Sequence, residues 1–164
     1  MGIELMEYEG AEYPAHVQSG NAVRFIEPMA LEFCKGEGLD IGGTNQWRLA
    51  GAKAINIIDD NEWHAMNLPE RECDYIFTSH TLEHLDEPRQ AIRYWRTRLK
   101  QGGVLFLYLP HASMAMWHPS RMSGHSHSFL PEEITALLEE CGFRRIFASG
   151  RDLNWSFAVV GEKA

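Results

Sequence analysis

The chain has 164 residues, 45% of them hydrophobic, and a formal net charge of −8 at pH 7. This length suits one domain with its own core, so we expect residues 1–164 to fold as a single unit. The acidic balance argues against a nucleic-acid partner, which needs a basic surface. The beginning of the chain has no long apolar run, so we expect neither a signal peptide nor a membrane span. Three widely spaced cysteines are typical of free thiols in a reducing compartment, which favours the cytoplasm.

Residues 1–20 show little periodicity and are expected to form a loosely packed lead-in, with Tyr8 and Tyr13 packing on the domain or covering a site. Ser19-Gly20-Asn21 predicts the start of a helix, and the apolar residues between positions 23 and 34 predict its buried face. Pro28 lies inside this helix and is expected to kink or split it.

A short strand is predicted to run from Gly38 into the turn at Gly42-Gly43. Such a turn lets the backbone approach a ligand closely and leaves N–H groups free to donate, although a plain tight turn is the alternative. A second strand is predicted over Lys53–Ile58, ending at Asp59 and Asp60. A carboxylate in this position can accept both hydroxyl protons of a ribose, and an ordinary Asp-Asp-Asn turn is the competing explanation.

After a contracted segment at 61–72, the chain predicts a βαβ unit. Tyr75–Thr78 is a β-prone run, and a helix follows with Asp86 as its N-cap and Gln101-Gly102-Gly103 at its end. Val104–Leu109 is the next strand, so the two strands should be parallel with a right-handed crossover. Ligands lie beyond the carboxyl ends of such strands, which places the following polar residues on one functional edge: Ser79, His80, Thr81, His84 and His111.

The long irregular loop over residues 112–128 is expected to have a functional role. Its methionines and tryptophan can form an adaptable apolar pocket wall: Met114, Met116, Trp117 and Met122. A helix from about Phe129 to Cys141 and two strands, Arg144–Ser149 and Trp155–Glu162, complete the predicted chain.

Several segments together resemble the class I S-adenosylmethionine-dependent methyltransferases. The similarity lies in Leu39-Asp40-Ile41-Gly42-Gly43, with a glycine loop one residue shorter than usual, in His64-Ala65-Met66-Asn67-Leu68-Pro69, and in the βαβ unit. Within that unit, the matching residues are Cys73-Asp74-Tyr75, Ser79, Leu82-Glu83-His84-Leu85, Leu99-Lys100-Gln101-Gly102-Gly103 and Pro110. The resemblance implies an α/β fold. We expect a shortened Rossmann-like, mainly parallel sheet with helices on both faces and a C-terminal antiparallel hairpin.

The resemblance also implies methyl transfer from S-adenosyl-L-methionine to a small-molecule or glycan-like acceptor. The residues it assigns to the cofactor are Asp40, Gly42, Gly43, Thr44, Asp59, Asp60, Ala65, Leu68 and Ser79. His111 and His80 are the candidates for a catalytic base, because a histidine can titrate near neutral pH. The trimmed sheet leaves an edge through which the chain could form a homodimer.

Two other functions fit parts of the sequence. The shortened glycine loop also suits a methyltransferase-like domain that has lost catalysis and acts as a binding or scaffold module. His80-Thr81-Leu82-Glu83-His84 matches the H-x-x-E-H zinc-protease pattern, which requires a helix and a third ligand. His125 and His127, with His111 or His118, form a second possible cluster, but without a nearby carboxylate or cysteine we predict no metal site.

Overall fold

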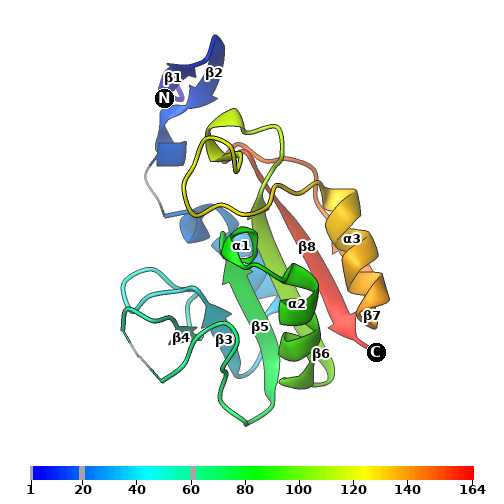
Figure 1. Ribbon diagram of the computed structural model, residues 1–164. Coiled ribbons are helices and arrows are strands. Elements are labelled where there is room, and N and C mark those ends of the chain that lie inside the picture. The colour runs from blue at the N-terminus through cyan, green and yellow to red at the C-terminus, as the bar shows by residue number, and fades with distance from the viewer. Residues whose placement is uncertain (1, 19–20, 60–61) are drawn as a thin grey trace.

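The computed structural model describes residues 2–18, 21–59 and 62–164. Six strands form the main sheet in the order β4-β3-β5-β6-β8-β7. Their bounds are β3 (Gly38–Ile41), β4 (Lys53–Ile55), β5 (Cys73–Ser79), β6 (Leu99–Pro110), β7 (Phe143–Ala148) and β8 (Ser156–Lys163). Within this sheet, neighbouring strands pair in parallel from β4 through β3 and β5 to β6, whereas β8 runs antiparallel to both β6 and β7. Figure 1 shows β5 and β8 pointing in opposite directions. The predicted parallel βαβ unit and C-terminal hairpin are therefore confirmed.

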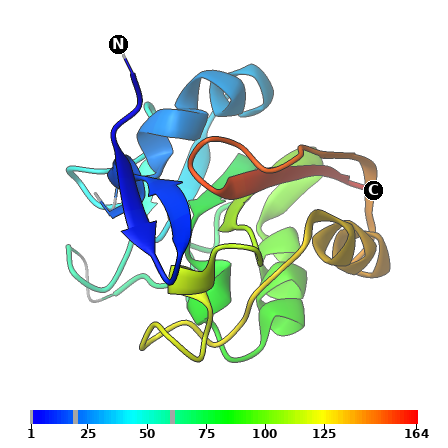
Figure 2. The same ribbon diagram turned by 90° about the horizontal axis from the view of Figure 1, so that it is seen from above.

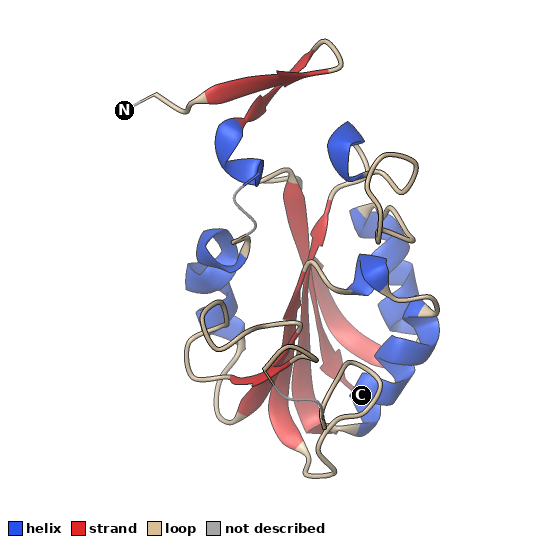
Figure 3. Cartoon of the chain, turned by 60° about the vertical axis from the view of Figure 1, so that its left-hand side comes forward, coloured by secondary structure: helices blue, strands red, loops and turns tan. Residues whose placement is uncertain are grey.

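Helices cover both faces of this sheet. Helix α1 (Val23–Phe33) packs on one face, while α2 (Pro88–Thr97) and α3 (Pro131–Glu140) pack on the other, as Figure 3 shows from the side. The strands carry apolar side chains on both faces because both are covered, and Trp95 of α2 is completely buried. Pro28 does not split α1, which is continuous across it. The expected Rossmann-like arrangement is confirmed.

The boundaries of α2 differ from the sequence prediction. Glu87, not Asp86, is the N-cap residue, and it makes no capping hydrogen bond through its side chain. The helix ends at Thr97, and Leu99 already pairs with Cys73 in the sheet. Gly102 therefore does not cap a helix. It takes a φ of +75° inside β6, beside the register shift between β5 and β6.

The segment between β3 and β5 is trimmed. Strand β4 has three residues and ends at Ile55, not at Ile58 as predicted. Asn56 begins a turn there, because its side-chain oxygen accepts hydrogen bonds from the N–H groups of Ile58 and Asp59. Within the described residues from 62 to 72, the chain forms no helix or strand, only an isolated bridge between His64 and Asn67. The sheet is thus a shortened version of the fold.

The N-terminal lead-in contains a β-hairpin that the sequence analysis missed. Strands β1 (Leu5–Tyr8) and β2 (Ala11–Pro14) pair antiparallel and lead into a 3-10 turn, η1 (Ala15–Gln18). The hairpin lies next to the 112–128 loop in Figures 1 and 2. Tyr13 is buried there against Trp155, as expected for a residue packing on the domain. Glu9 also pairs with Arg121 of the loop at 2.6 Å. The predicted helix start at Ser19-Gly20 lies outside the described residues.

No helix among the described residues is both long enough and apolar enough to cross a membrane.

Candidate active site

The strand order marks the place where a ligand is expected. The chain leaves β3 toward β4 on one side, and the next strand, β5, lies on the other side of β3. In parallel α/β sheets, ligands bind outside the carboxyl ends of the strands at such a reversal. Gly42 follows β3 and Ser79 ends β5, so both lie at this edge.

A pocket of about 190 Å³ opens at this edge, and we call it the glycine-loop pocket. It brings together five of the nine predicted cofactor residues. They are Asp40, Gly42, Gly43, Thr44 and Ser79. The pocket is also lined by four residues that were not predicted from the sequence: Asn21, Ala22, Val23 and Trp47. Position 21 lies in the segment where a helix start was predicted, but nothing in the residue pattern marked it as part of a site.

The two glycines are needed for the shape of this pocket. Gly42 has a φ of +89°, and a Cβ atom there would lie 2.0 Å from the Thr81 hydroxyl oxygen. A Cβ atom on Gly43 would lie 2.5 Å from Cγ of Asp40. The loop thus has no room for side chains where the chain turns from β3, and its backbone lies directly against the neighbouring residues.

Asp40 lies beneath the glycine loop with 1% of its surface exposed. Its Oδ2 accepts a hydrogen bond from the Leu49 N–H at 2.7 Å. Burial raises the pKa of the Asp40 carboxyl from 3.8 to about 7. Among the described residues, its Oδ1 and the buried Ser79 hydroxyl oxygen both lack a hydrogen-bond partner. Unpartnered buried polar atoms that border a pocket are available to a ligand.

Asp59 lies at the turn after β4, and its role is partly structural. Its Oδ2 accepts hydrogen bonds from the Asn45 N–H at 2.8 Å and from the Asn56 side-chain amide at 3.0 Å. These bonds tie the glycine loop to the turn, and the hydrogen bond from Asn45 is the main reason the pKa of Asp59 is lowered. A ribose contact at Asp59 stays a prediction. Asp60 lies outside the described residues.

The remaining two cofactor candidates lie apart from the glycine-loop pocket. The backbone carbonyl of Ala65 accepts a hydrogen bond from the Trp95 indole at 2.7 Å. Leu68 is buried, and its N–H donates to the Tyr94 hydroxyl at 2.7 Å. Leu68 lines a different hollow together with Trp63. The structure therefore does not bring these two residues together with Gly42.

A second pocket of about 330 Å³ adjoins the first, and we call it the histidine pocket. Asn21, Ala22 and His80 line both pockets. Met116, Trp117 and Met122 form part of its wall, which confirms the pocket wall predicted for the 112–128 loop. Met114 is instead buried beneath the N-terminal hairpin. His125 of the same loop also lines the pocket, together with His16 and Asn154, which were not predicted from the sequence.

The two predicted catalytic histidines differ in position. His80 stands where the pockets meet, and its Nε2 lies 2.8 Å from the Ser156 hydroxyl oxygen. Burial, with the nearby His125 and His84, lowers the pKa of His80 to about 3, so its ring is neutral near pH 7. His111 packs edge-on against Phe157, and its Nδ1 lies 2.8 Å from the Ser113 hydroxyl oxygen. In the described part of the chain, His111 lines neither pocket.

The zinc-protease pattern is not formed. Glu83 and His84 belong to η2 (Leu82–His84), a single 3-10 turn, where the pattern needs an α-helix. His80 adopts a φ of +49° and directs its Nε2 to Ser156.

Comparison with known proteins identifies the family. A family model described as a methyltransferase domain matches residues 18–146, which is most of the chain. This range contains all the residues that line the glycine-loop pocket and most of those that line the histidine pocket. The chain belongs to the methyltransferase domain family. The predicted resemblance is thereby confirmed. A search of curated protein sequences found no match.

Solved structures of other methyltransferases share this fold. A SAM-dependent methyltransferase from Archaeoglobus fulgidus superposes with a TM-score of 0.69 at 15% identity, over 90% of this chain and 97% of that one. A possible histamine N-methyltransferase from Thermotoga maritima superposes with a TM-score of 0.65 at 16% identity, over 91% of this chain and 97% of that one. The Burkholderia thailandensis 1,6-didemethyltoxoflavin-N1-methyltransferase was solved with bound 1,6-didemethyltoxoflavin and S-adenosylhomocysteine. It superposes with a TM-score of 0.65 at 14% identity, over 90% of this chain and 80% of that one.

Proposed function

We propose that this methyltransferase transfers a methyl group from S-adenosyl-L-methionine to a small-molecule or glycan-like acceptor. The observation that carries the proposal is the pair of adjoining pockets that meet at His80. One pocket lies at the glycine loop, where the family resemblance expects the donor. The other is lined by the 112–128 loop, for which the sequence predicted a functional role and an adaptable apolar pocket wall.

The residues of the glycine-loop pocket suit the methionine end of the donor. The unpartnered Asp40 Oδ1 can accept a hydrogen bond from an ammonium group, and the Ser79 hydroxyl can serve a carboxylate or an amine. Gly42 and Gly43 line the pocket without side chains, so a ligand can lie directly against the backbone there.

The bound donor supplies an electrophilic methyl group on a positively charged sulfur. The chain's own task is to hold an acceptor atom in line with that group, and such alignment is worth several kcal/mol in well-oriented reactions. A neutral His80 at the junction can accept a hydrogen bond from the acceptor and so orient it. With a pKa near 3, His80 is better suited to orienting an acceptor than to removing its proton at neutral pH.

The histidine pocket supports a small acceptor. Its volume of about 330 Å³ lies within the range of small-molecule sites, and Trp117 and the methionines offer apolar and aromatic contacts. Two proteins of similar structure are named for small nitrogen compounds, a possible histamine N-methyltransferase and the 1,6-didemethyltoxoflavin-N1-methyltransferase. The three buried cysteines are free thiols, in keeping with the reducing cytoplasm we propose as the location.

Titration calorimetry with S-adenosylmethionine and S-adenosylhomocysteine tests the proposal. We expect one site per chain with micromolar affinity. Asp59→Ala should weaken binding, because it releases the glycine loop from the turn after β4. Glu139→Ala, an exposed change on α3, serves as the matched control. Absence of binding to either ligand would refute the proposal and favour the catalytically inactive binding module, which the shortened glycine loop also suits.

A further inference from the structure

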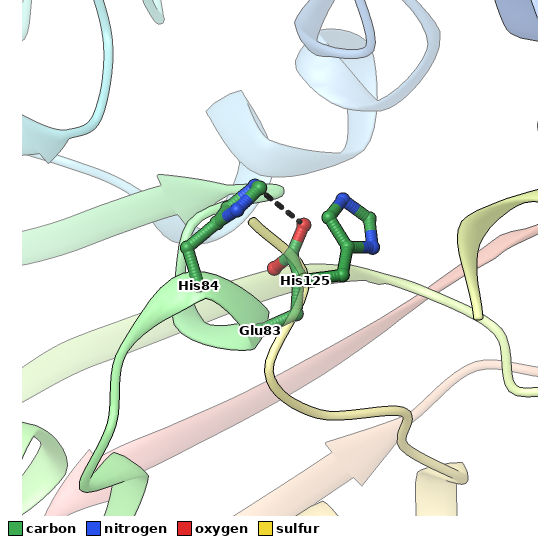
Figure 4. A group of neighbouring side chains, drawn as sticks. All are labelled: Glu83, His84 and His125. Carbon is green, nitrogen blue, oxygen red and sulfur yellow. Dashed lines mark ion pairs between the residues drawn. The ribbon is translucent and has the colours of Figure 1, made fainter. Parts of the chain in front are cut away.

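Three side chains from distant parts of the sequence converge beside the histidine pocket. Glu83 and His84 come from η2, and His125 comes from the 112–128 loop. Their potential ligand atoms all lie within 4.8 Å of one another. Figure 4 shows the Glu83 carboxylate between the two imidazole rings.

The Glu83 carboxylate is the unusual member of this group. It is completely buried, and neither oxygen has a hydrogen-bond partner in the described part of the protein. The nearest cationic candidate, His84 Nε2, is 3.7 Å from Oε1, which is too long for a hydrogen bond. Burying a carboxylate without a partner is costly, so such a group calls for a bound water or ion.

Both histidines are oriented as metal ligands usually are. Nδ1 of His84 lies 2.8 Å from the Gly124 carbonyl oxygen, and Nδ1 of His125 lies 2.7 Å from the Trp117 carbonyl oxygen. A carbonyl oxygen can only accept, so each Nδ1 carries the hydrogen, and each neutral ring keeps its lone pair on Nε2. Metal-bound histidines commonly donate the other ring N–H to a backbone carbonyl in this way.

We propose that Glu83, His84 and His125 bind a divalent transition-metal ion of the zinc class. Two imidazoles and one carboxylate are a ligand set that zinc and iron(II) use in proteins, whereas magnesium prefers oxygen ligands alone. Ligands about 2.1 Å from a tetrahedral ion lie about 3.4 Å apart. The 3.7 Å between His84 Nε2 and Glu83 Oε1 is close to that spacing, and all the potential ligand atoms lie within 4.8 Å of one another.

The backbone already holds these segments together. The N–H groups of Ser126 and His127 donate to the Glu83 carbonyl at 2.8 and 3.1 Å, so the loop is fixed to η2 without an ion. His125 also lines the histidine pocket, which places the ion at the wall of that pocket. Three protein ligands leave a coordination position for water or another small ligand.

Zinc binding to the full chain tests this site. After treatment with a chelator, the protein is titrated with Zn²⁺ in competition with a chromophoric zinc indicator. We expect one ion per chain, and we expect Glu83→Gln and His125→Ala each to weaken binding at least about tenfold, since even indirect ligand contacts are worth that much. His118→Ala, on the same loop but outside the cluster, is the control and should leave the affinity unchanged.

Thermal unfolding separates metal binding from folding. Without metal, Glu83→Gln should unfold at nearly the same temperature as the natural chain, because glutamine has almost the same shape as the buried carboxyl group, which has no hydrogen-bond partner in the described part of the chain. Added Zn²⁺ should raise the midpoint of the natural chain but not that of the variant. Failure to bind Zn²⁺, or equal affinity in the natural chain and both ligand variants, would overturn the proposal. Because S-adenosylhomocysteine binding is measured separately, that outcome would not bear on the proposed function.

Discussion

Replacing Asp40 with asparagine should remove a pH dependence of stability that arises beneath the glycine loop. The carboxyl is 1% exposed, and burial raises its pKa from 3.8 in the unfolded chain to about 7 in the folded one. Asparagine has nearly the same shape, and its side-chain oxygen can still accept the Leu49 N–H. The change therefore removes the ionisation while keeping the main hydrogen bond.

The sign follows from where the proton binds more tightly. Between pH 3.8 and about 7, the folded chain holds the Asp40 proton and the unfolded chain has lost it, so stability falls as the pH rises. Each pH unit in this window lowers the free energy of unfolding by up to about 1.4 kcal/mol, so the loss between pH 5 and pH 7 is up to about 3 kcal/mol. The asparagine variant should lose this slope, so its advantage over the natural chain should grow from pH 5 to pH 8.

Urea unfolding of both proteins at half-unit pH steps measures the effect, since the difference between them isolates position 40. Asp74→Asn is the control of opposite sign. The Asp74 carboxylate pairs with Lys100, which lowers its pKa, so its stabilising effect is present at neutral pH and is lost on acidification. Parallel stability profiles for Asp40→Asn and the natural chain would refute the assignment. Binding of S-adenosylhomocysteine should weaken in the variant, because an acceptor oxygen at the pocket becomes an amide donor.

Other substitutions test the site. Gly42→Ala should abolish binding of S-adenosylhomocysteine in calorimetry, because its Cβ would meet the Thr81 hydroxyl. Gly51→Ala has a similar positive φ but open space around it, so it should cost only about 1–2 kcal/mol of backbone strain in urea unfolding and leave binding intact. His80→Ala should lower the rate of methyl transfer more than His111→Ala, and product assays that rank them in reverse would move the reaction away from the shared wall of the two pockets. Between pH 5 and pH 8, the rate should show no titration of His80, whose pKa lies near 3.

The fold and the family were predictable because they depend on patterns in short stretches of sequence. The apolar runs of β5 and β6 and the glycine turn after β3 could each be identified in the sequence. The Gly102-Gly103 pair was misassigned as a helix cap because a glycine with positive φ suits both a helix end and an irregular strand. Pairing of Leu99 with Cys73 decided between them, and that contact is not visible in local sequence.

The candidate site was only partly predictable, for a related reason. Residues at or directly after the end of a strand, such as Ser79 and Gly42, were assigned to the correct edge of the sheet because the parallel topology dictates it. The approach of His125 to Glu83 depends on the path of a long loop, and the sequence analysis found no carboxylate near the loop histidines. Leu68 was assigned to the cofactor by similarity of motif; its side chain is buried, and its contact with the cofactor stays a prediction.

Shortening the sheet has a consequence for how copies of the chain meet. Strand β4, at one edge, has three residues, which is too few to guide the pairing of an incoming strand. The other edge, β7, is interrupted by a register shift, and its Arg144 and Arg145 both pair with Glu162 of β8. Both edges thus carry features that suppress edge-to-edge aggregation. The trimmed main sheet thus offers little template for pairing with a strand of another copy at either of these two edges, and the homodimer expected from the sequence stays a prediction.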